Sequence, residues 1–197
     1  MAADKETQFN KLLVVQVAAL SYELLKRRSG GEQWLGLNFT PIDAGVPGVT
    51  CSAPAAFRTA ADASTHGMIS NGLYRRDLGR AMFWEQSAAL VSGERIWKDF
   101  RAAGGTVAML FWQQSMGEDA DIIVTPAPIH KHHGGMIQDC YTRPPGLYQK
   151  LCTQTGGAFQ LRHYCGPLAS VKAGAWLADA TLALCHDHEL APDICLT

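Results

Sequence analysis

Hydrophobic residues gather in short, nearly continuous runs that are separated by segments rich in polar and turn-forming residues. Residues 106–112 (TVAMLFW) form the clearest run, and residues 121–125 form a second, shorter one. Residues 193–197 (DICLT) have the pattern of the opening of another buried strand. Apolar runs of this length without polar alternation are typical of strands buried on both faces of a parallel sheet. We therefore predict strands at these three places.

The first apolar run of the chain, residues 11–20 (KLLVVQVAAL), carries β-branched valines at its centre. This composition predicts a buried strand of a parallel sheet, although the alanine and leucine content leaves a helix possible. A short helix is predicted at residues 22–28, and the Ser29-Gly30-Gly31 sequence ends it.

Helix-like patterns fill most of the intervals between the strands. They are predicted at residues 53–63, 92–103, 145–153 and 168–186. The helix at 92–103 has Trp97 and Phe100 on its apolar face, and Gly104-Gly105 ends it. Residues 62–67 are predicted as a turn, and the segments 38–49 and 126–146 as loops rich in Pro and Gly. Strands that alternate with helices predict an α/β fold, a mainly parallel sheet with helices on both faces.

Composition narrows the class of protein. The chain has 197 residues, of which 47% are hydrophobic and 18% charged, which is typical of an ordinary globular domain. A formal net charge of −1 gives no electrostatic basis for binding a nucleic acid polymer or an anionic membrane. No apolar run reaches the ~20 residues that cross a bilayer. We expect neither nucleic acid nor membrane as a partner.

Cysteine usage bears on the compartment. The six cysteines are Cys51, Cys140, Cys152, Cys165, Cys185 and Cys195. None belongs to a C-x-x-C pair of the kind that binds zinc or exchanges disulfides. The N-terminal sequence MAADKETQFNK is polar and contains acidic residues, unlike a secretory signal. We therefore expect reduced thiols and a cytoplasmic location.

The stretch PGVTCSAPAAFRT, residues 47–59, places hydroxyl groups and a thiol where a strand or loop leads into a helix. Thr50 or Ser52 in this position is expected to cap the helix, a contribution of about 1 kcal/mol. Alternatively, Thr50 is a nucleophile, because the N-terminus of a helix favours a nearby phosphate. A threonine hydroxyl needs a base or a metal ion to act in this way. Local spacing leaves both interpretations open.

Residues 49–79 (VTCSAPAAFRTAADASTHGMISNGLYRRDLG) resemble the nucleotide pyrophosphatase/phosphodiesterase branch of the alkaline phosphatase superfamily. Thr50 matches the nucleophile that opens a helix in that branch. Thr59-Ala60 matches the Thr-Gly pair that closes this helix, and Thr65-His66-Gly67 matches the turn that follows. Asn71 matches the Asn that holds a phosphoryl oxygen.

The resemblance extends over nearly the whole chain. Residues 94–97 (ERIW) are similar to the family's x-x-I-W helix, and residues 110–112 (LFW) with Ser115 are similar to its F-F-W-x-x-S strand and loop. The segments DADIIVTPAPI, QDCYTRPP and GPLAS, which begin at Asp119, Gln138 and Gly166, resemble a prokaryotic subgroup. The order and spacing of these motifs carry the resemblance.

The resemblance implies a metal-dependent phosphodiesterase or nucleotide pyrophosphatase. Two divalent ions, usually zinc, would activate the oxygen of Thr50, which is therefore also a metal ligand, and would bear the charge on the phosphate and the leaving group. The reaction would pass through a phospho-threonine intermediate, with Asn71 donating a hydrogen bond to a nonbridging oxygen. The expected substrate is a small phosphoester. Nucleotide, lipid-headgroup and sugar-phosphate diesters all remain open.

The chain departs from the family pattern at the metal ligands. The family's first ligand is an Asp in a D-G-[FL] pattern at the end of the first strand, where this chain has Ala18-Ala19-Leu20. Gln16 lies on the same strand face, but a neutral amide is a poorer zinc ligand. The family's other Asp and His ligands fall beyond residue 197. We expect residues 1–197 to be the N-terminal portion of one alkaline phosphatase-like domain, incomplete at the C-terminus. The alternatives are a metal-free binding or scaffold protein that retains the fold, and a truncated inactive fragment.

Other residues that are suited to chemistry are expected to have structural roles. Two histidine clusters, at residues 130–133 and 186–188, are predicted to lie in a loop and at a helix end. His66 is expected to hydrogen-bond the backbone, and Cys51 to pack as a small apolar residue. The tryptophans Trp84, Trp97 and Trp112 are assigned to the core, and Arg75-Arg76 to a solvated turn.

Overall fold

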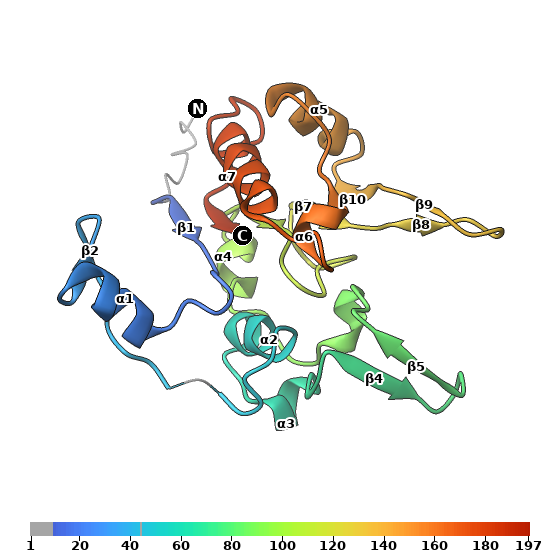
Figure 1. Ribbon diagram of the computed structural model, residues 1–197, viewed down its shortest axis with the longest axis horizontal. Coiled ribbons are helices and arrows are strands. Elements are labelled where there is room, and N and C mark those ends of the chain that lie inside the picture. Colours follow the sequence, from blue (N-terminus) through green and yellow to red (C-terminus); the bar gives the residue numbers. More distant parts are fainter. Residues whose placement is uncertain (1–9, 44) are drawn as a thin grey trace, which may run out of the picture.

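A five-stranded sheet forms the centre of the protein in the computed structural model, which describes residues 10–43 and 45–197 (Figure 1). The polar stretch at residues 1–9, on which we based the absence of a secretory signal, lies outside the described residues. The strands, in their order across the sheet, are β1 (Leu12–Val14), β11 (Ile194–Leu196), β6 (Val107–Leu110), β7 (Ile122–Pro126) and β10 (Cys140–Arg143). The first four are parallel, and β10 is antiparallel to β7. This confirms the mainly parallel sheet.

Helices cover both faces of this sheet. The helices are α1 (Tyr22–Ser29), α2 (Ser52–Thr59), α3 (Ala63–His66), α4 (Lys98–Ala102), α5 (Leu147–Gln154), α6 (Leu161–Tyr164) and α7 (Val171–Cys185), with a 3-10 helix at Ala88–Leu90. Alternate residues of β6 point to opposite faces. Ala108 and Leu110 pack against α5 and α7, whereas Val107 and Met109 pack on the side of α4. The predicted helices on both faces are confirmed.

The strand predicted within residues 11–20 is confirmed, but the prediction that this strand is buried is wrong. β1 lies at the edge of the sheet and pairs only with β11. The exposed fractions of Leu13 and Val15 are 48% and 58%. An edge strand has a neighbour on one side only, so its side chains are covered less than those of an interior strand. β11, in contrast, lies between β1 and β6, and the interior strand predicted near the end of the chain is confirmed.

Three hairpins were not predicted. They are β2 (Gln33–Trp34) with β3 (Leu37–Asn38), β4 (Gly72–Arg75) with β5 (Arg80–Phe83), and β8 (Ile129–His130) with β9 (Met136–Ile137). The β4–β5 and β8–β9 hairpins project away from the central sheet (Figure 1). Most of their residues are exposed, so they lack the continuous apolar run by which buried strands are recognised. The segment 126–146, predicted as a loop, contains both β8–β9 and the sheet strand β10.

Two predicted helices are shorter in the structure. α4 begins at Lys98 rather than near residue 92, because residues 92–97 follow an irregular path. α2 ends at Thr59, since Ala60 adopts a left-handed conformation with φ of 50°. The turn predicted at residues 62–67 contains the short helix α3, which the carboxylate of Asp62 caps.

The state of the cysteines and the character of the helices can also be read from the described residues. All six cysteines are free, as predicted. Within residues 10–43 and 45–197, none of the helices combines the length and the apolar character of a membrane span.

Candidate active site

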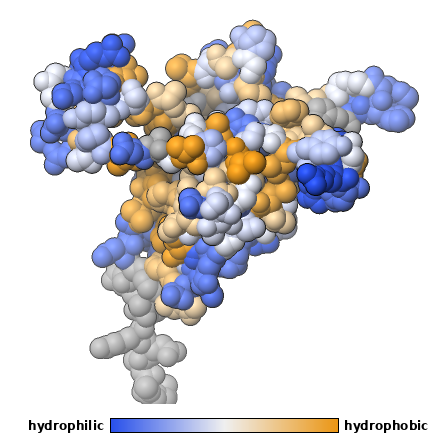
Figure 2. All heavy atoms as spheres, turned by 90° about the horizontal axis from the view of Figure 1, so that it is seen from below, coloured by the Kyte–Doolittle hydropathy of each residue, from blue (hydrophilic) through white to orange (hydrophobic). Residues whose placement is uncertain are grey.

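A cleft of about 1580 Å³ opens at the carboxyl ends of β1, β11 and β6. Open α/β sheets bind their ligands at this edge. Gln16 follows β1, Thr197 follows β11 and Phe111 follows β6, and all three line the cleft. The start of α2 and the face of α7 around Thr181 complete the wall. Seen from below, hydrophobic residues gather over the middle of the molecule and hydrophilic residues over its projecting parts (Figure 2).

Thr50 stands at this cleft immediately before α2. Its side chain is exposed, and the residue belongs to the lining of the cleft. The helix starts without a side-chain cap: Cys51 is in the N-cap position, and no side-chain cap hydrogen bond is made there. The carbonyl of Val49 instead accepts hydrogen bonds from the N–H groups of Ser52 and Ala53, at 3.1 and 3.2 Å. The interpretation of Thr50 or Ser52 as the cap is therefore wrong, and the hydroxyl of Thr50 is not used by the helix.

Asn71 contacts the same helix start through its side chain. Its Oδ1 accepts a hydrogen bond from the backbone N–H of Cys51 at 3.0 Å. Its carbonyl accepts one from the N–H of Trp84 at 3.0 Å, at the base of the β4–β5 hairpin. Because Oδ1 is the acceptor here, the two hydrogens on Nδ2 are left to donate elsewhere. The structure therefore places Asn71 beside the residue that follows Thr50.

His66 supports the turn between these two residues. The side chain is fully buried, and its Nδ1 accepts a hydrogen bond from the N–H of Met68 at 3.1 Å. Burial lowers the pKa of His66, which favours the neutral ring. With Nδ1 as an acceptor, the proton of the neutral ring is on Nε2, which has no hydrogen-bond partner among the described residues. The predicted hydrogen bond to the backbone is confirmed.

An ion cluster under α2 was missed by the sequence analysis. Arg58 and Glu118 have exposed side-chain fractions of 0% and 3%, and Nη1 of Arg58 lies 2.9 Å from the Glu118 carboxylate. Nε of Arg95 binds the same carboxylate at 2.9 Å. Burial lowers the pKa of Arg58 to about 10, although the charge of Glu118 opposes this shift. One signal was available: Arg58 falls on the same helical stripe as the buried Cys51 and Ala55, at a spacing where an apolar residue is expected.

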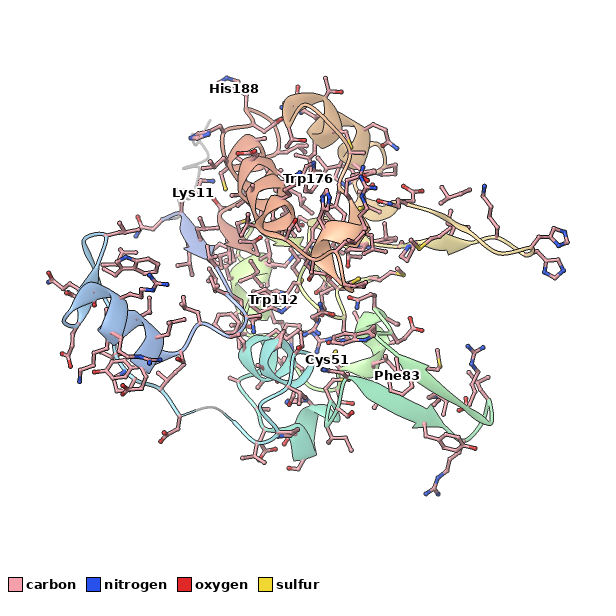
Figure 3. All side chains as sticks on the ribbon, viewed as in Figure 1. Lys11, Cys51, Phe83, Trp112, Trp176 and His188 are labelled. Carbon is pink, nitrogen blue, oxygen red and sulfur yellow. The ribbon has the colours of Figure 1, made fainter. Side chains whose placement is uncertain are left out.

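The other chemical candidates have the structural roles expected of them, with one exception. Cys51 packs with Ala55 and Met68, and burial raises the pKa of its thiol, which disfavours a nucleophilic thiolate. Trp97 and Trp112 are core residues, as predicted, and Trp112 lies beside α2, where its Nε1 donates to the carbonyl of Pro54 at 3.4 Å (Figure 3). The core assignment of Trp84 is wrong, because this side chain is 51% exposed next to the hairpin.

Charged and histidine-rich turns lie away from the cleft. Arg75 pairs with Asp77 in the exposed turn of the β4–β5 hairpin, as expected of a solvated turn. His132 and His133 are exposed between β8 and β9, while the side chain of His130 lies outside the described residues. In the cluster at residues 186–188, Asp187 accepts hydrogen bonds from the N–H groups of Glu189 and Leu190. The described side chains of these turns form no shared ligand set.

The cleft residues do not fit a two-metal site. Ala18 lines the cleft in the turn that follows β1, four residues after Val14, and its side chain has no donor atom, as the sequence indicated. Asp62, another lining residue, uses Oδ1 to accept hydrogen bonds from Ser64 and Thr65. Across residues 10–43 and 45–197, no three side chains of His, Cys, Asp or Glu come together in a way that could hold a metal ion.

Comparisons with known proteins were made for both sequence and structure. No curated protein sequence matches the chain. Two crystal structures of phosphonoacetate hydrolase from Sinorhizobium meliloti 1021, in complex with phosphonoacetate and with phosphonoformate, are similar with TM-scores of 0.48 and 0.47. Their sequence identities are 15% and 16%, and each match covers 78% of this chain and 35% of the other. The chain thus spans about a third of the length of these proteins.

A family model supplies the assignment. The model described as type I phosphodiesterase / nucleotide pyrophosphatase matches residues 35–192. The matched range contains Thr50, Asn71, the ion cluster under α2 and three of the five strands of the central sheet. The chain therefore belongs to the type I phosphodiesterase / nucleotide pyrophosphatase family.

Proposed function

We propose that this chain carries the nucleophile of a hydrolase that cleaves phosphoric ester or diester bonds, and that Thr50 is this nucleophile. One observation carries the proposal: Thr50 stands exposed in the cleft at the start of α2, and Asn71 is bonded to the next residue of the same helix start. This arrangement supports the proposal that the hydroxyl of Thr50 and the amide of Asn71 act on the same phosphate group. Membership of the family supports a phosphoester hydrolase as the class of enzyme.

In the proposed reaction, the oxygen of Thr50 forms a bond to phosphorus while the ester P–O bond breaks. The hydroxyl proton passes to solvent water, and the leaving oxygen departs with the electron pair and takes up a proton from the solvent. A water molecule then attacks the phospho-threonine, which releases the phosphate product and restores Thr50. Nδ2 of Asn71 donates a hydrogen bond to a nonbridging oxygen, and the partial positive charge at the N-terminus of α2 favours the phosphoryl group.

Metal binding is a separate part of the proposal. The family resemblance implies two divalent ions, zinc as a rule, with Thr50 as one ligand. The other residues that line the cleft within the described ranges do not fit such a site. Ala18 replaces the carboxylate, Asp62 is engaged as a cap, and Asp43, which also lines the cleft, belongs to no group of three ligands. We therefore assign to this chain the positioning of the nucleophile and of the phosphoryl oxygen.

A second candidate function has its own supporting observation. The lack of a carboxylate at Ala18 favours a metal-free protein that binds a phosphate-containing ligand without turnover. The small phosphoester substrate, the cytoplasmic location and the assignment of residues 1–197 to the N-terminal portion of one domain stay predictions under either function.

The experiment that tests the proposal measures hydrolysis of bis-p-nitrophenyl phosphate with added zinc. We expect Thr50→Ala to abolish turnover and Thr50→Ser to retain part of it, because serine keeps the hydroxyl. Thr153→Ala is the matched control, since Thr153 is exposed on α5 and bonds only within its helix. Equal rates for the wild type and Thr50→Ala would remove Thr50 from the mechanism. Binding of inorganic phosphate without any turnover would favour the second function.

A further inference from the structure

Two guanidinium groups share one carboxylate beneath the helix that begins after Thr50. Arg58 donates from Nη1 to the Glu118 carboxylate at 2.9 Å, and Arg95 donates from Nε to both oxygens of Glu118 at 2.9 Å. The N–H of Asp119 adds a further hydrogen bond to Glu118, at 2.9 Å. Charges this deeply buried are costly unless they are well paired, so the cluster constrains the elements that contribute to it.

The cluster joins three segments that are distant in the sequence. Arg58 belongs to α2, Glu118 to the segment that follows β6, and Arg95 to the segment before α4. Arg58 also donates to the carbonyls of Gln114 and Gln113, at 2.7 and 2.8 Å. Because a guanidinium is planar, bonds from Nη1 and Nη2 to these different acceptors fix its orientation as well as its position.

α2 also contacts distant segments outside the ion cluster: Nε1 of Trp112 donates to the carbonyl of Pro54 at 3.4 Å, and the N–H of Ile96 donates to the carbonyl of Arg58 at 2.9 Å. The helix is eight residues long, and its buried apolar contacts come mainly from small side chains such as Cys51 and Ala55. Short helices depend on tertiary contacts for their stability. Arg58 follows Thr50 by about two helical turns, or roughly 12 Å, so a shift or rotation of α2 at Arg58 moves Thr50 with it.

The segment after β6 depends on the same cluster. Phe111 and Gln114 have φ values of 55° and 50°, a left-handed conformation that non-glycine residues rarely adopt. Such conformations persist where the surrounding contacts enforce them. Gln113, which lies between them, lines the cleft, and its carbonyl accepts from Arg58. Arg58 thus links the wall that carries Thr50 to the wall that carries Gln113.

We infer that Arg58, paired with Glu118 and Arg95, is a positioning residue. Through α2 it holds Thr50 in place relative to Asn71 and to the opposite wall of the cleft. Its structural effect stands on the contacts above, and its effect on catalysis rests on the proposed function. Arg58 does not line the cleft, so it acts on the reaction only through the helix.

The test uses Arg58→Lys and Glu118→Gln in the full chain, with Arg75→Lys as the matched control. Arg75 is also an arginine paired with a carboxylate, but the pair is exposed on the β4–β5 hairpin. Lysine keeps the positive charge of Arg58 but lacks the planar guanidinium that donates to several acceptors at once. Hydrogen exchange is followed in peptides from residues 50–60 and from the strands β6 and β7. We expect the amides of α2 to exchange about tenfold faster in both variants, and by a larger factor than the amides of the strands.

The same variants are assayed for hydrolysis of bis-p-nitrophenyl phosphate. We expect kcat to fall by about tenfold or more while KM changes by less than about twofold, because misplacing a nucleophile lowers the rate of chemistry more than it weakens binding. Arg75→Lys is expected to match the wild type in both measurements. A larger rise of exchange in α2 than in the strands would support the inference.

Two outcomes would overturn it. In one, Arg58→Lys keeps the exchange of α2 and the kcat of the wild type. In the other, exchange rises by the same factor in α2 and in the strands, so the substitutions act only through global unfolding and have no separate effect on α2. If the wild type shows no hydrolysis, the proposed function fails, and the exchange of α2 decides the positioning role alone.

Discussion

The side-chain oxygen of Asn71 accepts a hydrogen bond from the backbone N–H of Cys51 at 3.0 Å, although the two residues are 20 positions apart in the sequence. The bond satisfies one of the N–H groups that a helix start leaves without an intrahelical partner. It also fixes which end of the Asn71 amide faces the helix. In the proposed function Asn71 has two separable tasks: its oxygen holds the start of α2, and its nitrogen would donate to a phosphoryl oxygen.

The substitution Asn71→Asp separates these tasks. The carboxylate that it introduces would keep an acceptor for the N–H of Cys51 but would lose the donor and add a negative charge beside the phosphoryl group. We expect kcat/KM for bis-p-nitrophenyl phosphate to fall by about 10²-fold or more, as on removal of a donor to developing charge in other enzymes. Steady-state kinetics measure the effect.

Asn38→Asp is the control for this substitution. Asn38 is exposed in the β2–β3 hairpin, where it accepts a hydrogen bond from Gln33 at 2.7 Å. We expect its kcat/KM to equal that of the wild type. A wild-type kcat/KM in Asn71→Asp would exclude Asn71 as the donor.

Zinc binding by this chain is expected to be weak. The described cleft residues provide no carboxylate at Ala18 and no group of three ligands. After reconstitution and desalting, elemental analysis should find less than one equivalent of zinc per chain. Ala18→Asp should retain more zinc than the wild type, because it introduces an anionic oxygen into the turn that follows β1. A full equivalent on the wild type would show that other residues complete the site.

Arg58→Met tests the contribution of the buried ion cluster to stability. The substitution removes one cation from a carboxylate whose exposed fraction is only 3%, and leaves Glu118 with Arg95 alone. Breaking a buried pair in this way costs about 3 to 5 kcal/mol of unfolding free energy. Urea denaturation followed by circular dichroism measures the loss.

Arg75→Met serves as the comparison, because its partner Asp77 is in an exposed turn. We expect its urea midpoint to be unchanged, since exposed ion pairs contribute little. Equal midpoints for Arg58→Met and the wild type would show that the cluster contributes nothing to stability.

Asp193 should make the stability of the sheet depend on pH. Its carboxylate accepts from the N–H and the hydroxyl of Thr106, both at 2.9 Å, and pairs with Lys11 at 2.8 Å. Burial acts to raise the pKa of Asp193, but the bonds from Lys11 and Thr106 outweigh it and hold the pKa below its usual value. Since the folded pKa is the lower one, the stabilisation is complete above the unfolded pKa of about 3.9 and is lost as the pH falls through the folded value.

Asp193→Asn isolates this effect. At pH 7 the wild type should unfold at a higher temperature than the variant, and this difference should shrink as the pH falls below about 4. Asp179→Asn, on the exposed side of α7, should show no such trend. A difference between the wild type and Asp193→Asn that stays constant down to the acid limit of folding would contradict the assignment.

The sequence by itself determined the interior of the sheet. β6, β7 and β11 were predicted because a strand covered on both faces needs a continuous apolar run, and such a run is visible locally. The order of the motifs from Thr50 to Asn71 likewise indicated the family. The helix at residues 22–28 was predicted to end at the Ser29-Gly30-Gly31 sequence, because glycine is a local signal for the end of a helix; α1 ends at Ser29, and Gly30 follows it with φ of 72°.

The tertiary structure alone decided the position of β1 at the edge of the sheet, the addition of β10, and the partners of the buried charges. Arg58 and Glu118 are 60 positions apart, and the sequence near either residue does not indicate that the other is its partner. Such pairs form because the fold brings distant segments of the chain together, and local hydrophobic periodicity does not indicate which segments meet. For the same reason the sequence suggested that Thr50 could cap a helix. In the fold, the N–H of Cys51 at that helix start donates to Asn71 instead, and the threonine lines the cleft.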